Sequence, residues 1–444
     1  MPQWSCLRLT IEKLIYGGDG LARTAPDAAG RRKAIFVPFV LDGEQIDATV
    51  IEEKPGFLRA RADKILKPSP ERAVPACPYF VNCGGCHYQH TTYEHQLQIK
   101  SAILRETIER IAKVPLPEQP HLHAAAPWNY RNRTRMKVRG GRRFAMGYHR
   151  FASHELLPVE QCPISSRLIN RAIEALWKLG RAEAVPREIE EIEFFASHDD
   201  ESLLLELNLD DHATQGISSG ITQFVRALRG SLPAIAGVAV FRRQGQNLRH
   251  EMIPQPLRDI FGAQELTYHA AEGKYRVSAG SFFQTNRHLT DTMVHIVTHG
   301  RMGDFALDLY SGVGLFTLPM SQNFREVASV EAAPYSYHDL RRNSPSNVTA
   351  YHTSTEQFLS GARDIAQFDY VVVDPPRGGM GEEVAKKLGE LGAPRITYVS
   401  CDPATLARDL TVLLAAGYLI SKTHLIDLFP QTFHIESIVE LKVG

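Results

Sequence analysis

The sequence D-L-Y-S-G-V-G-L-F at residues 308–316 gives the clearest indication of the fold. It closes an apolar strand and opens a helix, and its glycines allow a tight turn in which the backbone approaches a ligand. The next predicted strand ends at Glu331, where a carboxylate can accept hydrogen bonds from two ribose hydroxyls. A Gly-x-Gly turn also fits simple helix packing, but together with Glu331 it favours a nucleoside cofactor. Tyr310 and Leu315 replace glycines of a full dinucleotide motif, which favours S-adenosylmethionine because it has no phosphate to bind.

Strands and helices alternate on both sides of this turn, from about residue 275 onward. Apolar runs predict six strands, with helical stretches between the earlier ones. A turn at residues 430–432 joins the last two strands. This pattern predicts a doubly wound, Rossmann-like α/β domain that ends in a hairpin. The predicted strands are 305–309, 326–331, 370–374, 395–400, 421–428 and 435–443.

Polar residues follow three of these strands, at the sheet edge where open α/β sheets bind ligands. Asp374 begins D-P-P-R-G-G, Cys401 begins C-D-P, and Glu436 ends H-I-E in the last hairpin. Asp374 would also suit a helix cap, and a lone glutamate on a strand is usually solvated. A free cysteine is usually a small buried apolar residue. The place of Cys401 directly after a strand favours a nucleophile instead.

The rest of the chain predicts two further domains. Residues 5–66 alternate short β-type runs with turns, which predicts a small barrel followed by a linker at 67–70. Apolar positions at helical spacing predict a helix from Tyr93 to Val114, and Pro115 ends it. Residues 121–270 mix strands and helices, so we expect a central α+β domain there.

Four of the six cysteines form one pattern: Cys77, Cys83 and Cys86 in C-P-Y-F-V-N-C-G-G-C, and Cys162 far downstream. The N-terminus has no apolar export signal, so we expect a reducing cytoplasm, where clustered cysteines bind metal or catalyse. Four thiolates suit a 4Fe–4S cluster or a structural zinc ion, and the spacing alone leaves both open. His87 and His90 are alternative ligands. Cys6, in the first predicted strand, is expected to serve packing.

A cationic stretch lies between Gln119 and His154, where no acidic residue occurs. Its central part, R-N-R-T-R-M-K-V-R, alternates with period two, so a strand would place five cations on one face. Charge runs usually form a solvated face, but the lack of nearby carboxylates favours contact with RNA phosphates. The five residues are Arg131, Arg133, Arg135, Lys137 and Arg139.

Composition sets broader limits. The 444 residues are 43% hydrophobic and 23% charged, which is typical of a globular protein of several domains. Lys plus Arg equals Asp plus Glu, 50 against 50, so net charge indicates no partner. No apolar run is long enough to span a bilayer, and we expect no membrane association. Nothing in the sequence indicates an obligate protein partner.

Four motifs in order closely resemble the RNA 5-methyluridine methyltransferase family. They are D-L-Y-S-G-V-G-L-F-T-L-P, V-V-V-D-P-P-R-G-G, Y-V-S-C-D-P-A-T-L-A-R-D-L and F-P-Q-T-F-H-I-E-S-I-V-E-L. The cysteine motif with Cys162 resembles the 4Fe–4S motif of the rRNA-modifying branch. The predicted barrel resembles that branch's TRAM domain, an OB-like RNA-binding module. The resemblance covers essentially the whole chain.

The resemblance implies methyl transfer from S-adenosylmethionine to C5 of uracil in RNA. Cys401 would add to C6 as the nucleophile, Glu436 would remove the C5 proton, and Asp374 would bind the uracil edge. The four cysteines would hold a 4Fe–4S cluster. Leu315 stands where the family often has Asn, which removes one expected polar contact. The cofactor would lie against Gln284, Tyr310, Gly312, Glu331 and Asp374.

We expect ribosomal RNA as the substrate, with transfer RNA as the alternative. Two other readings remain open at this point. An amino-group methyltransferase also has an Asp-Pro-Pro-like motif, although Arg377 stands where its aromatic residue would stack on the base. A non-catalytic iron–sulfur RNA-binding protein would need neither Cys401 nor Glu436. The expected domains are 1–67 (barrel), 73–92 with 120–270 (iron–sulfur and RNA-binding), and 93–119 with 271–444 (methyltransferase).

Overall fold

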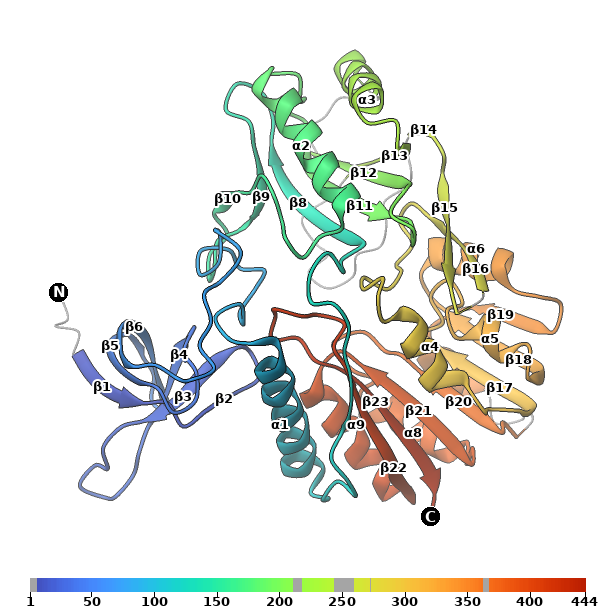
Figure 1. The fold of residues 1–444 in the computed structure, drawn as a ribbon. Helices are drawn as coiled ribbons and strands as arrows, with labels where there is room; N and C mark the ends of the chain where they lie inside the picture. The colour runs from blue at the N-terminus through green and yellow to red at the C-terminus, as the bar shows by residue number, and fades with distance from the viewer. Residues whose placement is uncertain (1–5, 211–217, 243–258, 272, 362–366) are drawn as a thin grey trace.

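The computed structural model of the chain describes residues 6–210, 218–242, 259–271, 273–361 and 367–444. Three β-sheets with their helices form an N-terminal, a central and a C-terminal body (Figure 1). The chain passes between the bodies more than once. Helix α1 (Tyr93–Ala112) and strand β7 (His121–His123) belong to the C-terminal body, although the central body follows them in sequence.

The N-terminal body is a six-stranded sheet in the order β1-β5-β6-β4-β3-β2. β4 and β5 bury alternate side chains, as strands with one face on a core do. β1 and β2 are consecutive in the chain yet lie at opposite edges, so the sheet curls round, and the predicted small β-body is confirmed as a half-barrel. Its strands are β1 (Cys6–Thr10), β2 (Lys13–Leu14), β3 (Asp19–Arg23), β4 (Ala34–Pro38), β5 (Gln45–Glu53) and β6 (Phe57–Lys67).

The central body is a seven-stranded sheet in the order β10-β9-β8-β11-β12-β13-β14. Helices α2 and α3 share an apolar core with this sheet. Ser166 and Ser218 cap these helices by accepting a hydrogen bond from the backbone N–H three residues on. Its elements are β8 (Arg133–Arg139), β9 (Ala145–His149), β10 (Leu156–Pro158), α2 (Arg167–Arg181), β11 (Ile189–Ala196), β12 (Leu203–Leu209), α3 (Ser219–Ser231), β13 (Ile235–Arg242) and β14 (Asp259–Gly262).

The C-terminal body is an eight-stranded sheet in the order β19-β18-β17-β20-β21-β23-β22-β7. From β17 the chain builds outward to one side through β18 and β19, then returns to the other side of β17 with β20. This reversal creates a switch point between β17 and β20, where such sheets bind ligands. The strands are β17 (Gly303–Leu309), β18 (Phe324–Glu331), β19 (Val348–His352), β20 (Tyr370–Val373), β21 (Arg395–Ser400), β22 (Tyr418–Ile426) and β23 (Glu436–Val443).

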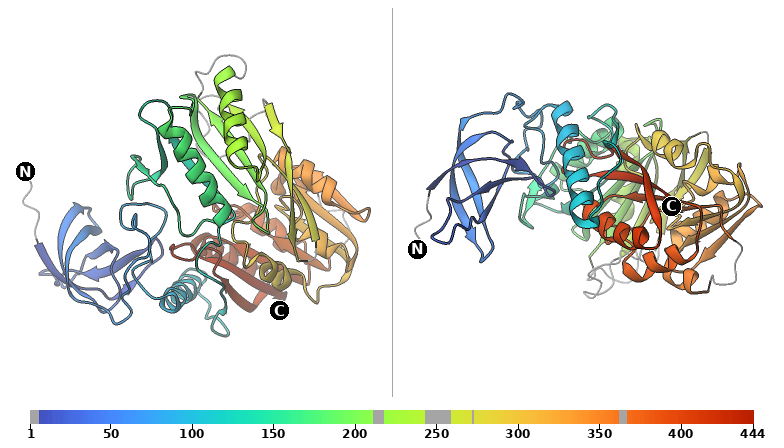
Figure 2. Two further views of the ribbon diagram at one scale, coloured as in Figure 1. Left: turned by 45° about the horizontal axis from the view of Figure 1, so that its top comes forward. Right: turned by 90° about the horizontal axis from the view of Figure 1, so that it is seen from below.

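Helices cover this sheet, and α1 joins them by packing against α9. Figure 2 shows α1 between the N-terminal half-barrel and the C-terminal strands in both views. A separate hairpin of β15 (Glu265–Ala270) and β16 (Gly273–Ser278) contributes to the second apolar core of this body. The helices are α4 (Thr290–Thr298), α5 (Thr317–Met320), α6 (Pro334–Asn343), α7 (Thr355–Gly361), α8 (Glu382–Glu390) and α9 (Pro403–Ala415).

All six strands predicted for the C-terminal domain are present, with ends shifted by at most a few residues. The helix predicted from Tyr93 is confirmed. Two described strands of the eight-stranded sheet were not predicted: β19, and β7, which pairs with β22. The expected boundary at residue 119 is therefore wrong by a few residues, because β7 belongs to the catalytic sheet. Among the described residues, no helix is long and apolar enough to cross a membrane.

Candidate active site and cysteine cavity

Three adjacent strands bring Asp374, Cys401 and Glu436 to one edge of the sheet. Asp374 directly follows β20, Cys401 follows β21, and Glu436 opens β23. In the antiparallel pair β21–β23, Ser400 lies opposite Ser437. Cys401 and Glu436 are the residues next to this pair, so the antiparallel register brings them close together. The effect of the Glu436 charge on the pKa of Cys401 agrees with this proximity. The Ser437 hydroxyl donates to the Ser400 carbonyl at 3.3 Å and fixes this register.

Electrostatics at this edge disfavour negative charge. Burial, followed by the charge of Glu436 and then of Asp374, raises the pKa of Cys401 to about 12. Burial, with a contribution from Asp308, raises the pKa of Asp374 to about 8. Burial and the nearby Asp374 also raise the pKa of Glu436 well above its usual value. The Arg377 guanidinium acts in the opposite direction and lowers the pKa of both Cys401 and Glu436.

Asp308 is a third carboxyl at the same edge, besides Asp374 and Glu436, and sequence reasoning did not single it out. It is fully buried near the end of β17, and Thr317 donates to its Oδ2 at 2.5 Å. Its Oδ1 is buried with no hydrogen-bond partner in the described structure. Burial, with a smaller effect of Glu331, raises its pKa to about 7. An unpaired acceptor beside Asp374 suits a cationic or hydrogen-bonding ligand at the switch point.

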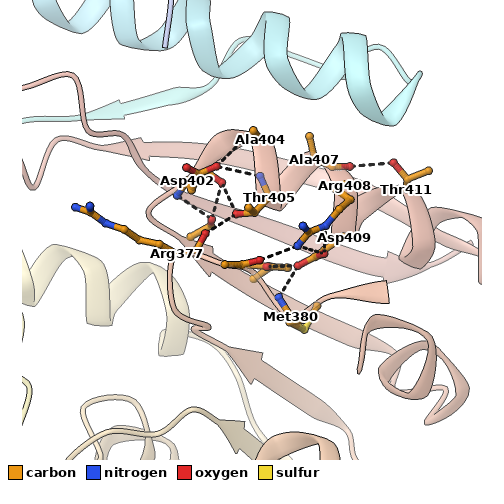
Figure 3. A network of polar contacts seen from close by, with 12 residues as sticks. Arg377, Met380, Asp402, Ala404, Thr405, Ala407, Arg408, Asp409 and Thr411 are labelled. Atoms are coloured by element: carbon orange, nitrogen blue, oxygen red, sulfur yellow. Dashed lines mark hydrogen bonds and ion pairs between the residues drawn. The ribbon is translucent and has the colours of Figure 1, made fainter. Parts of the chain in front are cut away.

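The loops after β20 and β21 are tied together by helix α9 (Figure 3). Asp402 caps α9 by accepting from the N–H groups of Ala404 and Thr405. The Met380 N–H donates to Asp409 at 2.7 Å, and Arg408 donates to the Gly378 carbonyl at 2.8 Å.

Gly379 lies against this network. It adopts φ +74°, and a Cβ there would meet Asp409 Oδ2 at 2.6 Å, so glycine is required at this position. The D-P-P-R-G-G loop therefore has a fixed position relative to Cys401.

The half-barrel also reaches the active site. Tyr16, between β2 and β3, donates from its hydroxyl to the Cys401 carbonyl at 3.5 Å. Its ring packs edge-on against Phe433, with centroids 5.6 Å apart. Leu14 of β2 is buried in the same apolar core as Leu406 of α9. Sequence reasoning missed these contacts, because nothing near Tyr16 indicates a partner 385 residues away.

The glycine turn after β17 has the geometry that close approach to a ligand requires. Tyr310 adopts φ +62°, a left-handed conformation uncommon for residues other than glycine, so it occupies a glycine-like position despite its side chain. Gly312 also has positive φ, and its N–H donates to Glu331 Oε2 at 2.8 Å. The turn and the acid predicted from sequence thus contact each other. Gln284 is buried in the segment between β16 and α4.

A cavity lies beside the loops that carry Arg377 and His434. Its volume is about 340 Å³, and Cys77, Cys83, Cys86 and Cys162 all line it. Arg377 and His434, from the catalytic loops, line it too. All six cysteines are free thiols. The charges of the other cavity cysteines add to burial in raising the pKa of Cys86 to about 12.

The tRNA (uracil-5-)-methyltransferase family model matches residues 92–443. The chain belongs to this family. It is 32% identical to an RNA methyltransferase of Aquifex aeolicus, over 98% of both chains. It is also 32% identical to a 23S rRNA (uracil(1939)-C(5))-methyltransferase of Pectobacterium atrosepticum, over 97% of this chain and 92% of that one.

A solved structure shares the fold. The tRNA (uracil-54, C5)-methyltransferase of Pyrococcus abyssi, in complex with S-adenosyl-L-homocysteine, superposes with a TM-score of 0.74 at 22% identity. The match covers 98% of this chain and 100% of that one. The predicted class, an RNA (uracil-C5)-methyltransferase with an α/β catalytic domain, is therefore confirmed.

The premise of the predicted cation row is wrong for three of its members. Arg133 and Arg135 both form ion pairs with Glu193, and Lys137 pairs with Glu191 at 2.6 Å. Both acids lie on the neighbouring strand β11, far away in sequence. Arg139 is exposed and donates to the Arg143 carbonyl. Phosphate contact by this face stays a prediction.

Arg131 lies apart from the other four cations. It precedes β8 and lines the cysteine cavity, and its Nε is buried without a hydrogen-bond partner among the described residues. An unpaired guanidinium nitrogen beside four thiols fits an anionic group in that cavity.

Proposed function

We propose that this methyltransferase modifies C5 of a uridine in ribosomal RNA, with Cys401 as nucleophile and Glu436 as base. The observation that carries this assignment is the close approach of Cys401 and Glu436 at the edge of the sheet where Ser400 pairs with Ser437. Asp374, directly after the neighbouring strand β20, lies beside them. A thiol and a carboxyl that lie close together can work on the two neighbouring carbons of one pyrimidine ring. Neither an amino-group methyltransferase nor a simple RNA-binding protein needs this pair.

The steps follow from the two positions. The Cys401 thiolate adds to C6, and the electron pair of the C5–C6 double bond moves onto C5 and the adjoining carbonyl, as in an enolate. C5 thereby becomes nucleophilic. C5 then takes the methyl group supplied by the cofactor. Glu436, as a carboxylate, removes the proton from C5. The C5–C6 double bond re-forms, the C6–S bond breaks, and the thiolate of Cys401 is released.

The raised pKa values set a requirement for this chemistry. Cys401 and Glu436 both have to lose a proton, and burial disfavours the charge on each. The Arg377 guanidinium lowers the pKa of both groups. Cys401 also directly precedes the N-terminus of α9, whose dipole favours a thiolate. Arg377 therefore supports loss of the proton from both Cys401 and Glu436, and the N-terminus of α9 supports it for Cys401.

S-adenosylmethionine is the proposed methyl donor. Glu331, which accepts a hydrogen bond from the Gly312 N–H of the glycine turn, would accept the ribose hydroxyls. Tyr310, Gly312 and Gln284 would complete the pocket. Asp308 and Asp374 would face the positive sulfonium, which would favour their charged forms.

The four cavity cysteines are proposed to hold a 4Fe–4S cluster. No group of three or more His, Cys, Asp or Glu side chains in the described ranges is arranged to hold a metal ion. A cubane cluster binds each thiolate at a different iron, so its ligands lie farther apart than those of one ion. The unpaired Arg131 supports an anionic occupant. Iron and sulfide analysis of protein purified without oxygen should give about four of each per chain, whereas one zinc per chain would contradict the cluster.

RNA contact is proposed for the half-barrel and for the exposed part of the β8 face around Arg139. Of the relatives named above, one is named for 23S rRNA and is 32% identical to this chain, and one is named for tRNA and is 22% identical. Mapping 5-methyluridine in RNA from cells that lack the protein tests the choice of substrate. Loss of one modified position in 23S rRNA is expected, and loss only in tRNA would overturn it.

The catalytic assignment is tested with RNA that contains 5-fluorouridine. Fluorine cannot leave C5 as a proton does, so the methylated ring should stay bound to Cys401 and migrate with the protein on a denaturing gel. Cys401→Ala should give no adduct. Cys6→Ala, which removes an exposed cysteine of β1, is the matched control and should react normally. An adduct that survives Cys401→Ala would show that another residue is the nucleophile.

A further inference from the structure

The loop that delivers Glu436 runs from residue 427 to 435, between β22 and β23. Most of this loop is buried, including Asp427, Leu428 and Gln431. Gln431 adopts a left-handed conformation with φ +70°. A buried loop has to satisfy its backbone polar groups by contacts with other segments. The partners of this loop therefore reveal what holds the catalytic base in place.

Consecutive carbonyls of the loop accept hydrogen bonds from side chains and amides outside it. Lys100 donates to the Phe429 carbonyl at 2.9 Å, and Asn286 donates to that of Leu428 at 3.0 Å. The Tyr130 hydroxyl donates to the Pro430 carbonyl at 3.0 Å. The Gln431 carbonyl accepts from the N–H groups of residues 87 and 88, at 2.8 and 3.0 Å.

Two side chains of α1, Lys100 and Gln96, make further contacts with the side chains and backbone of the loop. Lys100 has no exposed surface, and its Nζ lies 2.6 Å from Oδ1 of Asp427. One turn earlier, Gln96 forms a reciprocal pair with Gln431. It donates to the side-chain oxygen of Gln431 at 3.0 Å and accepts from the Gln431 N–H at 2.9 Å. Helix α1 thus forms hydrogen bonds with the start of the loop, at Asp427, and with its bend, at Gln431.

Stability alone does not explain a lysine at this place. Removing two charges from water costs free energy that their attraction only partly returns, and apolar residues often do as well or better. A Lys–Asp pair with a carbonyl as a further acceptor does fix the direction of the chain, because each hydrogen bond constrains an angle as well as a distance. The arrangement therefore suits a part of the structure where position matters more than stability.

We infer that Lys100 and Gln96 are positioning residues for Glu436, which hold the 427–435 loop so that the base reaches the C5 proton. This inference rests on the proposed role of Glu436. Misplacing a reacting group by about 1 Å can cost about 100-fold in rate. The loss of rate should therefore affect proton removal, whereas Cys401, between β21 and α9, keeps its own contacts.

Two variants test the inference. Lys100→Met combined with Asp427→Leu removes both charges together, so neither is left buried alone. Gln96→Leu breaks the pair with Gln431 and leaves every charge in place, which covers the case in which the double variant fails to fold. Lys13→Met, which loses only an exposed ion pair with Glu106 of α1, is the control.

Three readouts separate positioning from general damage. With 5-fluorouridine RNA, both variants should form adduct at a rate close to that of the parent protein. With ordinary RNA, turnover should fall about tenfold or more, and methylated adduct should accumulate on denaturing gels. The control should match the parent in all three readouts. Normal turnover, or an equal fall in adduct formation and turnover, would overturn the inference.

Glu436→Gln, measured alongside, separates this inference from the proposed function. If Glu436→Gln accumulates adduct and the α1 variants do not, the positioning role is wrong and the base assignment stands. If Glu436→Gln releases product normally, Glu436 is not the base, and both ideas fail.

Discussion

Two buried carboxyls in this molecule have pKa values shifted in opposite directions. In the central sheet, burial alone would raise the pKa of Glu193, but the guanidinium groups of Arg133 and Arg135 bring it below its usual value. The neighbouring Glu206 keeps a raised pKa of about 7, because burial and the charge of Glu193 outweigh Arg133. At the catalytic edge, the pKa of Asp374 rises to about 8, and no cation among the described residues offsets this rise. A buried carboxyl without a cationic partner, such as Asp374, is therefore a candidate for contact with a ligand.

The largest effect should come from the base. Glu436→Gln keeps the size of the side chain but cannot accept the C5 proton, so turnover should fall by about 100-fold or more. The global fold should persist, because a neutral amide suits a site that already disfavours charge. Steady-state turnover and urea unfolding of the same preparation check both parts. If Glu436→Gln lost stability as well as turnover, the Glu436 carboxyl would support the fold as Glu193 does, which would contradict the comparison.

Replacement of Glu193 in the central sheet should lower the stability of the fold rather than the rate of the reaction. Glu193→Gln leaves Arg135 and part of Arg133 without their buried partner, and breaking such a pair costs about 3–5 kcal/mol. Urea denaturation should show this loss in the free energy of unfolding. At low temperature the protein that remains folded should still form the adduct with 5-fluorouridine RNA. Adduct formation that disappears while the fold persists would place Glu193 in the reaction.

A smaller effect concerns pH. A carboxyl with a raised pKa in the folded state favours folding below its unfolded pKa, near 4, and that contribution is lost as pH rises through about 8. Asp374→Asn removes this loss. The variant should therefore melt at the same temperature as the parent near pH 4, and a few degrees higher at pH 9. Equal melting temperatures at pH 9 would mean that the Asp374 carboxyl ionises freely.

The smallest effects concern the remaining cations of β8. Lys137→Met removes a partly exposed ion pair with Glu191 and should cost less than about 1 kcal/mol. If the β8 face meets RNA, Arg139→Met should weaken RNA binding and reduce its salt dependence by about one phosphate contact. Lys137→Met should change that slope less, because Lys137 already has a carboxylate partner. Identical slopes for both variants would argue against a phosphate contact at Arg139.

The contrast also explains what the sequence could and could not predict. The six strands of the catalytic sheet follow from local apolar runs, and Asp374 and Cys401 were found because each directly follows such a run. Pairing across strands is not local. Glu193 lies 60 positions from Arg133, so the cation row looked unpartnered. Asp308 was overlooked for a similar reason, since its missing partner becomes visible only when the packing around β17 is known.

The long separation between α1 and its partners has a consequence for synthesis. Lys100 and Asp427 are 327 positions apart, and β7 pairs with β22 over a similar distance. At about 5–20 residues per second, a ribosome needs roughly 15–65 s to make the chain between them. Throughout that time α1 has emerged while the strand and loop it will hold do not yet exist. The catalytic sheet can therefore be completed only when the last part of the chain emerges, so the nascent chain has no active form before then.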